Sequence, residues 1–137
     1  MATIKSYSDL QQSRKLAEFL PLESADMWWS RCTITDFGDG ILKVSYAVEP
    51  CNISQFRNTK EDIPCWSLAA LISIIPQEIF DGEYVINITE GSDNRWVLTY
   101  DHYENRNYSY YSLFTGADNL IDACVAMIEK LNKLKLL

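Results

Sequence analysis

The spacing of apolar residues along the chain predicts three helices, the first over about residues 9–20. Its apolar residues fall on one side of a helical projection, as in a helix that covers a core. Ser8 is in position to act as the N-cap, and Gln11 would complete an S-x-x-Q capping box with it. Pro21 cannot continue a helix and therefore ends this one.

The second predicted helix covers about residues 64–75, between Pro64 and Pro76. Pro64 suits the first turn of a helix, where a backbone N–H is not needed. The segment is apolar on every side of its axis, which predicts burial on most sides. We therefore expect Trp66–Ile75 to be the centre of the core, with no room beside it for buried catalytic groups.

The third predicted helix covers about residues 120–134. Its apolar positions follow a 4-3-4-3 spacing, which is typical of an amphipathic helix lying on a sheet. The residues at these positions are Leu120, Cys124, Met127, Leu131 and Leu134.

Extended segments separated by turns predict the strands. β-Branched and aromatic residues, and in places a two-residue alternation, mark five of them: residues 27–35, 41–48, 84–90, 96–102 and 108–114. Short turns between neighbours favour antiparallel hairpins. We expect one α+β domain over residues 1–137, with two layers, in which an antiparallel sheet of about five strands carries three helices in the order α-β-β-α-β-β-β-α. Residues 49–63 form the longest irregular stretch.

Charge narrows the range of partners. The chain has 12 basic and 19 acidic residues, a net charge of −7, and residues 36–129 alone carry 15 acids against 5 bases. An acidic surface repels phosphate backbones, and no basic stripe is present, so we expect no nucleic-acid partner. The same acidity motivates an alternative function, an inhibitor or immunity-type partner of a basic protein.

Apolar runs do not suggest a membrane protein. The N-terminal residues lack the apolar region of a secretory signal, and the longest apolar stretch, Pro64–Pro76, is shorter than a membrane span requires. We therefore expect a cytoplasmic protein with no membrane partner.

Candidate catalytic groups are few. The four cysteines contain no C-x-x-C pair, so we expect buried thiols and no metal site. Cys65, at the start of the second predicted helix, is the one thiol whose pKa a helix N-terminus could lower, and it underlies an alternative function as a small hydrolase. A pair of carboxylates, such as Asp36 with Asp39 or Asp118 with Asp122, would be the other route to that function. The single histidine, His102, is interpreted as a structural residue at a strand end, at a sheet edge beside Tyr103. The absence of phosphate-loop motifs gives no reason to expect a cofactor.

Aromatic residues give the strongest indication of a binding surface. Many gather between Tyr100 and Phe114, and others lie on the remaining strands. Exposed aromatic side chains mark recognition surfaces, whereas a cross-strand ladder that only stabilises the solvent-facing side of the sheet is the alternative. On strand alternation, Tyr108 and Tyr110 would share one face and Tyr111 would lie on the other. The candidate binding residues are Trp28, Trp96, Tyr108 and Tyr110.

Three segments carry a resemblance to other proteins: residues 20–27 (LPLESADM), 63–71 (IPCWSLAAL) and 117–128 (ADNLIDACVAMI). In these segments the chain resembles small uncharacterised proteins of gut anaerobic bacteria and of their phages and mobile elements. The similarity runs over most of the chain in the same order. It implies a bacterial or phage setting and assigns no activity.

Together these features predict a non-enzymatic accessory or binding protein, associated with a phage or mobile element, whose partner is another protein. A homodimer is an alternative, because the third helix is followed by Leu136 and Leu137.

Overall fold

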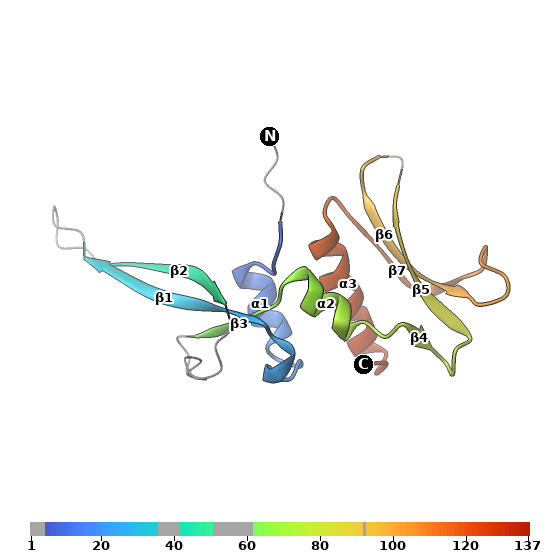
Figure 1. The fold of residues 1–137 in the computed structure, drawn as a ribbon, viewed down its shortest axis with the longest axis horizontal. Helices are drawn as coiled ribbons and strands as arrows, with labels where there is room; N and C mark the ends of the chain where they lie inside the picture. The colour runs from blue at the N-terminus through green and yellow to red at the C-terminus, as the bar shows by residue number, and fades with distance from the viewer. Residues whose placement is uncertain (1–4, 36–41, 51–61, 92) are drawn as a thin grey trace. The chain divides into compact units, whose positions relative to one another are not determined.

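The computed structural model describes residues 5–35, 42–50, 62–91 and 93–137 (Figure 1). The chain divides into two compact units. The N-terminal unit is Asp9–Ser67; the C-terminal unit is Leu68–Leu137 together with Met1–Ser8, of which residues 5–8 are described. The expectation of a single domain over residues 1–137 stays a prediction.

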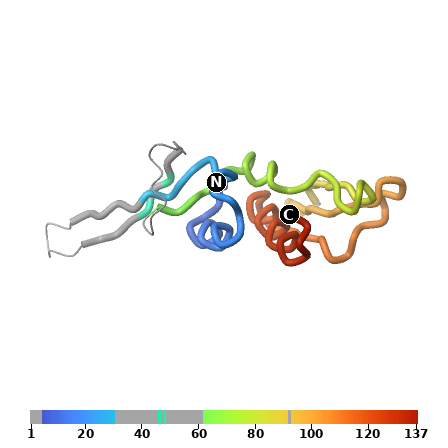
Figure 2. The backbone as a smooth tube through the Cα atoms, turned by 90° about the horizontal axis from the view of Figure 1, so that it is seen from below, coloured from blue at the N-terminus to red at the C-terminus, as the bar shows by residue number. Residues whose placement is uncertain are grey.

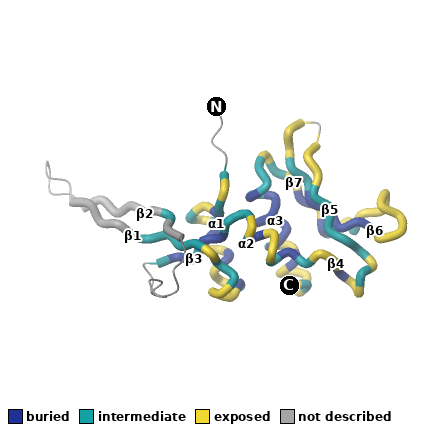
Figure 3. The backbone as a smooth tube through the Cα atoms, viewed as in Figure 1, coloured by how far each residue is buried: buried dark blue, intermediate teal, exposed yellow. Residues whose placement is uncertain are grey.

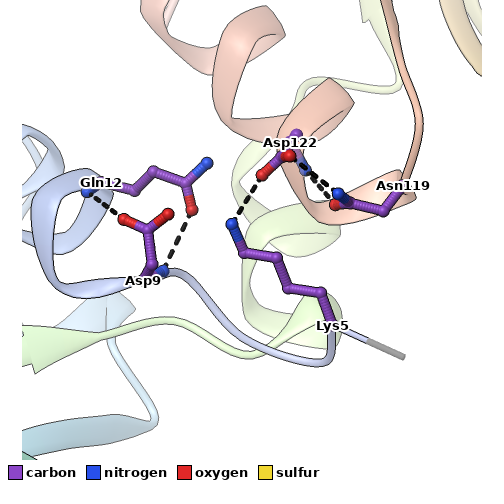
Figure 4. Close-up of polar contacts among 5 residues, drawn as sticks. All are labelled: Lys5, Asp9, Gln12, Asn119 and Asp122. Carbon is purple, nitrogen blue, oxygen red and sulfur yellow. Dashed lines mark hydrogen bonds and ion pairs between the residues drawn. The ribbon is translucent and has the colours of Figure 1, made fainter. Parts of the chain in front are cut away.

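The N-terminal unit begins with helix α1, Leu10–Leu16. Its N-cap is Asp9, whose carboxylate accepts from the Gln12 backbone N–H at 2.8 Å while the Gln12 side chain accepts from the Asp9 N–H at 3.0 Å (Figure 4). The capping box therefore lies one residue later than the predicted Ser8–Gln11 pair, because aspartate caps a helix as well as serine does. The helix is also shorter than predicted, since the N–H groups of Glu18 and Phe19 bond three residues back, in a tighter turn.

A three-stranded antiparallel sheet completes this unit, in the order β2-β1-β3 (Figure 1). Its strands are β1 (Met27–Thr35), β2 (Leu42–Pro50) and β3 (Ile63–Cys65), and a 3₁₀ turn, η1 (Leu22–Ser24), precedes them. The pairing of β1 with β2 confirms the first predicted hairpin. The central part of the predicted 49–63 loop, residues 51–61, lies outside the described residues.

Strand β3 occupies residues predicted to begin the second helix. Ile63 and Cys65 are buried and Pro64 between them is half-buried, the alternation of a strand. Proline is tolerated here because β3 lies at an edge of the sheet, where one row of N–H groups has no ladder partner. The following Trp66 is fully buried, and its indole N–H donates to Ser24 Oγ at 2.9 Å.

The C-terminal unit consists of a four-stranded antiparallel sheet and two helices. The sheet order is β4-β5-β6-β7, which confirms the second hairpin and the further strand after it. The elements are α2 (Leu68–Ile74), β4 (Glu78–Ile79), β5 (Tyr84–Glu90), β6 (Trp96–His102), β7 (Ser109–Ala117) and α3 (Leu120–Lys133).

Helix α3, red in Figure 2, organises the core of this unit. It packs against β6, β7 and α2, and seven of its residues are buried (dark blue in Figure 3). The Thr115 hydroxyl of β7 donates to the Ala123 carbonyl of α3 at 3.1 Å. Thr115 pairs with Leu98 across the two strands, so both side chains face the helix. Because side chains alternate along a strand, every second residue of β6 after Leu98 faces the helix too.

Helix α2 is not the buried hub that its sequence predicts. Leu71 is its one fully buried residue, whereas Ile72 is 41% exposed and Ser73 is exposed. The Ser73 hydroxyl returns to the Ala69 carbonyl at 2.8 Å on that open side. A helix that is apolar all round has no preferred face, so its neighbours decide which side is covered, and α3 covers only one.

The α+β class, with antiparallel strands and three α-helices among the described residues, is confirmed. The strands form two sheets where one was predicted, because β3 and β4 add two short strands and β1–β3 pair among themselves. Within the described ranges, no helix is long and apolar enough to cross a membrane.

Candidate binding surface

One end of the four-stranded sheet carries a group of aromatic side chains in mutual contact. We call this group the aromatic cluster; its members are Phe80, Tyr84, His102, Tyr103, Tyr110 and Tyr111. They come from the β4–β5 turn, the start of β5, the end of β6 and the start of β7. Antiparallel strands bring these four places together at one end of the sheet.

Three rings form the centre of the aromatic cluster. The Phe80 ring meets the Tyr84 ring at 6.1 Å and the Tyr110 ring at 5.2 Å, and Tyr84 meets Tyr110 at 5.4 Å, all between ring centroids. The three pairs are inclined at 60–78°, the edge-to-face arrangement that aromatic quadrupoles favour. Phe80 is nevertheless 43% exposed, so this centre reaches the surface.

Three further contacts extend the aromatic cluster. His102 is the cross-strand partner of Tyr84, with ring centroids 5.6 Å apart, and it stacks on Tyr103 at 4.9 Å. Tyr111 lies 5.5 Å from Tyr110 and is 86% exposed. The rings therefore run from a half-buried centre to exposed tyrosines.

The β4–β5 turn presents Phe80 through an unusual backbone conformation. Phe80, Asp81 and Gly82 have φ values of 53°, 55° and 87°. The left-handed region costs a residue with a Cβ about 1–2 kcal/mol, and bulky residues rarely occupy it. Two hydrogen bonds hold the turn: Glu83 N–H to the Phe80 carbonyl at 3.2 Å, and Tyr103 N–H to the Glu83 carbonyl at 3.0 Å. The second bond ties the turn to the end of β6.

An irregularity in β7 places Tyr110 and Tyr111 in the same cluster. Thr99 pairs with Phe114 but Asp101 pairs with Ser109, so residues 110–113 lie opposite Tyr100 alone. Such a bulge interrupts the alternation of side chains. The expectation that Tyr111 lies on the opposite face from Tyr110 is therefore wrong, since their rings are in contact.

A buried polar network fixes the strands beside the bulge. Asp101 is 6% exposed, and its carboxylate accepts from Ser109 Oγ at 2.6 Å and from Asn87 Nδ2 at 3.0 Å. The network links β5, β6 and β7 next to the aromatic cluster. It satisfies a carboxylate that would otherwise be costly to bury.

His102 has a structural role. Its Nδ1 accepts from the backbone N–H groups of Glu104 and Asn105 at 3.2 and 3.3 Å, so the ring caps the turn that follows β6. Its placement at a strand end beside Tyr103 agrees with the prediction, although β6 is an internal strand and not a sheet edge.

Register shows which face of the sheet bears the aromatic cluster. His102 lies two residues after Tyr100, whose hydroxyl donates to the Pro76 carbonyl at 2.6 Å on the helix-facing side. Tyr84 pairs with His102 and shares that face. The aromatic cluster is thus the uncovered end of the face that carries the core, and not a ladder on the solvent-facing side.

Carboxylates accompany the rings. Glu78, Asp81, Glu83 and Glu104 are all exposed. The Tyr103 hydroxyl donates to Glu104 Oε1 at 3.1 Å, and this bond is the main reason that the pKa of Tyr103 is raised. Partial burial, and after it the negative charge of Glu83, raises the pKa of Tyr84. Two rings of the aromatic cluster, those of Tyr84 and Tyr103, therefore have carboxylates nearby.

The four residues predicted from sequence do not form one surface. Tyr110 belongs to the aromatic cluster, and Tyr108 is 65% exposed in the turn before β7. Trp96 begins β6, at the other end of the sheet, and pairs with Glu90 and Ala117. Trp28 is half-buried in β1, in the N-terminal unit.

The thiols offer no accessible nucleophile among those described. Cys65 is fully buried in β3 and not at a helix N-terminus, so the position that suggested a reactive thiol is not the one it occupies. Cys124 is fully buried in α3, and burial raises the pKa of its thiol to about 11. Cys51 lies outside the described residues, as does the side chain of Cys32.

Within the Asp118/Asp122 pair, Asp122 has a structural role at the start of α3. Asp122 accepts from Lys5 Nζ at 2.7 Å and from Asn119 Nδ2 at 2.7 Å, and its N–H donates back to Asn119 at the start of α3 (Figure 4). The Asp118 side chain is 93% exposed, and the Asp36/Asp39 pair lies outside the described residues. The described residues contain no group of three or more His, Cys, Asp or Glu that could hold a metal ion.

Comparisons of the chain with protein-family models, with curated proteins and with solved structures found no match.

Proposed function

We propose that this chain is a non-enzymatic accessory protein that binds another protein through the aromatic cluster. The observation that carries the proposal is the set of exposed rings held in place by a left-handed turn and a bulged strand. Rigid aromatic side chains lose little conformational entropy on binding, and they are enriched where partners contact each other. The strain at Phe80 is explained if its ring must be displayed.

The burial of the Cys65 thiol weakens the alternative of a small hydrolase. The acidity of residues 36–129 favours a protein partner over a nucleic acid. The proposed setting, the cytoplasm of a bacterium or in association with its phages or mobile elements, rests on the resemblance of the three segments named above.

A retention experiment tests the proposal. Wild-type protein and the variants Tyr111→Thr and Phe114→Thr are immobilised and exposed to extract of the source organism, and retained proteins are identified by mass spectrometry. Phe114 is a matched control, because it is 53% exposed but precedes the helix-facing Thr115 and so lies on the other face of the sheet.

We expect a protein that wild type and Phe114→Thr retain and Tyr111→Thr does not. Equal retention by all three, or none above the bare matrix, would overturn the proposal. Light scattering on the same samples measures the mass of the protein in solution and so tests the homodimer alternative. A wild-type dimer that Tyr111→Thr converts to a monomer would assign the aromatic cluster to self-association instead.

A further inference from the structure

We propose that the aromatic cluster recognises a cationic segment of its partner, with arginine or lysine side chains placed over the exposed ring faces. This inference rests on the proposed function and specifies the chemistry of the partner. It is carried by the coincidence of accessible rings and excess negative charge at one place.

The rings supply faces on which a cation can lie. Within the aromatic cluster, Tyr111 is 86% exposed, Tyr103 54% and Phe80 43%; Tyr108, outside the cluster and just before β7, is 65% exposed. The face of an aromatic ring is the negative part of its quadrupole, and a guanidinium or ammonium within about 6 Å of the centroid is attracted to it. Arginine also stacks on such rings through its planar group.

The segments that form the aromatic cluster also carry excess negative charge. Apart from the buried Asp101, residues 77–85 and 101–111 contain four carboxylates, all exposed, and one basic side chain, that of Arg106. The net charge of these two segments is therefore −3. The Glu104 carboxylate accepts a hydrogen bond from the Tyr103 hydroxyl. The Glu78 carboxylate lies against Gly82 in the β4–β5 turn, with one oxygen 3.5 Å from the position that a Cβ would take there. Both carboxylates thus lie close to the segments that carry the rings.

This combination selects among partner types. A purely apolar partner would leave the carboxylates without counterions at the rim, and an acidic partner would be repelled. A basic segment satisfies both features, because its charges pair with Glu83 and Glu104 while the stems of its side chains pack on the rings. The fixed β4–β5 turn and the bulge keep the rings in place before binding, which lowers the ordering cost.

The test uses the full chain and a fluorescein-labelled peptide of alternating glycine and arginine, with the corresponding glutamate peptide as the charge control. Binding is measured by fluorescence anisotropy for wild type, Tyr111→Thr, Phe80→Asn and Phe114→Thr. None of these substitutions changes the net charge. Asparagine tolerates the left-handed region, so Phe80→Asn removes the ring and keeps the turn.

We expect the arginine peptide to bind wild type and Phe114→Thr equally, and Tyr111→Thr and Phe80→Asn about tenfold more weakly. We expect no binding of the glutamate peptide, and weaker binding of the arginine peptide as salt rises from about 50 to about 500 mM. The same Kd for all four proteins would overturn the inference, because attraction to the net charge of the chain alone would then suffice. No binding of the arginine peptide to wild type would also overturn it.

The two proposals can fail separately. If an extract protein is retained in a Tyr111-dependent but salt-independent manner and the arginine peptide does not bind, the cationic inference is wrong and the binding function stands. If retention does not depend on Tyr111, the proposed function itself is wrong.

Discussion

Paired truncations in α3 and α2 test which helix organises the C-terminal unit. Leu131 in α3 is fully buried, whereas Ile72 in α2 is 41% exposed. Replacing a fully buried leucine by alanine removes its transfer free energy and leaves a cavity, at a cost of about 3 kcal/mol. Replacing Ile72 loses the burial of only part of a side chain, and alanine is the better helix former, so we expect a net cost of about 0.5 kcal/mol.

Urea unfolding, followed by circular dichroism and tryptophan fluorescence, measures both costs. With an m-value of about 1.5 kcal/mol/M, Leu131→Ala lowers the midpoint by about 2 M and Ile72→Ala by about 0.3 M. The comparison holds if both variants keep the wild-type m-value. A loss for Ile72→Ala as large as that for Leu131→Ala would refute the placement of the core under α3.

Three further predictions follow from buried or bonded groups. The pKa of the Cys124 thiol is raised from 9.0 to about 11, so the stability it contributes is complete below pH 9 and is lost as pH rises through 11, a loss on the order of 3 kcal/mol; Cys124→Ala should flatten that part of a urea-midpoint profile, and an unchanged slope would contradict the burial. Tyr100→Phe removes the 2.6 Å bond to the Pro76 carbonyl and should cost about 1 kcal/mol in the same assay, whereas no loss would mean that the bond is absent. A double-mutant cycle on Lys5 and Asp122, whose side chains are 26% and 38% exposed, should give a coupling of about 0.5 kcal/mol that falls in 1 M salt, and a salt-independent coupling would count against an ion pair.

Periodicity predicted the elements in which one face is buried. Helix α3 and both hairpins follow from it, because their apolar positions match the helical or strand repeat. The capping shift from Ser8 to Asp9 is a local ambiguity, since two good N-cap residues are adjacent and each has a glutamine three residues on. The prediction of one buried helix over residues 64–75 was wrong because a continuous apolar run bounded by prolines fits such a helix. Periodicity does not distinguish a buried helix from a short strand followed by a half-exposed helix, which is what the structure contains.

The sequence predicted only part of the aromatic cluster. The density of tyrosines pointed to Tyr108 and Tyr110, but nothing in the alternation predicted the bulge that puts Tyr111 beside Tyr110. Phe80 was missed because its place depends on a left-handed backbone that a phenylalanine rarely adopts. The available signal was the Asp81-Gly82 pair, which marks a turn but not the ring presented before it.

The most direct test of cation recognition by the aromatic cluster is a titration of the protein with the glycine–arginine peptide, followed through the NMR signals of its aromatic rings. We expect the signals of Phe80, Tyr110 and Tyr111 to shift together and to saturate with one Kd, while those of Phe114 stay unchanged. Shifts of Phe114 or Trp28 without any change at Phe80 and Tyr111 would contradict it.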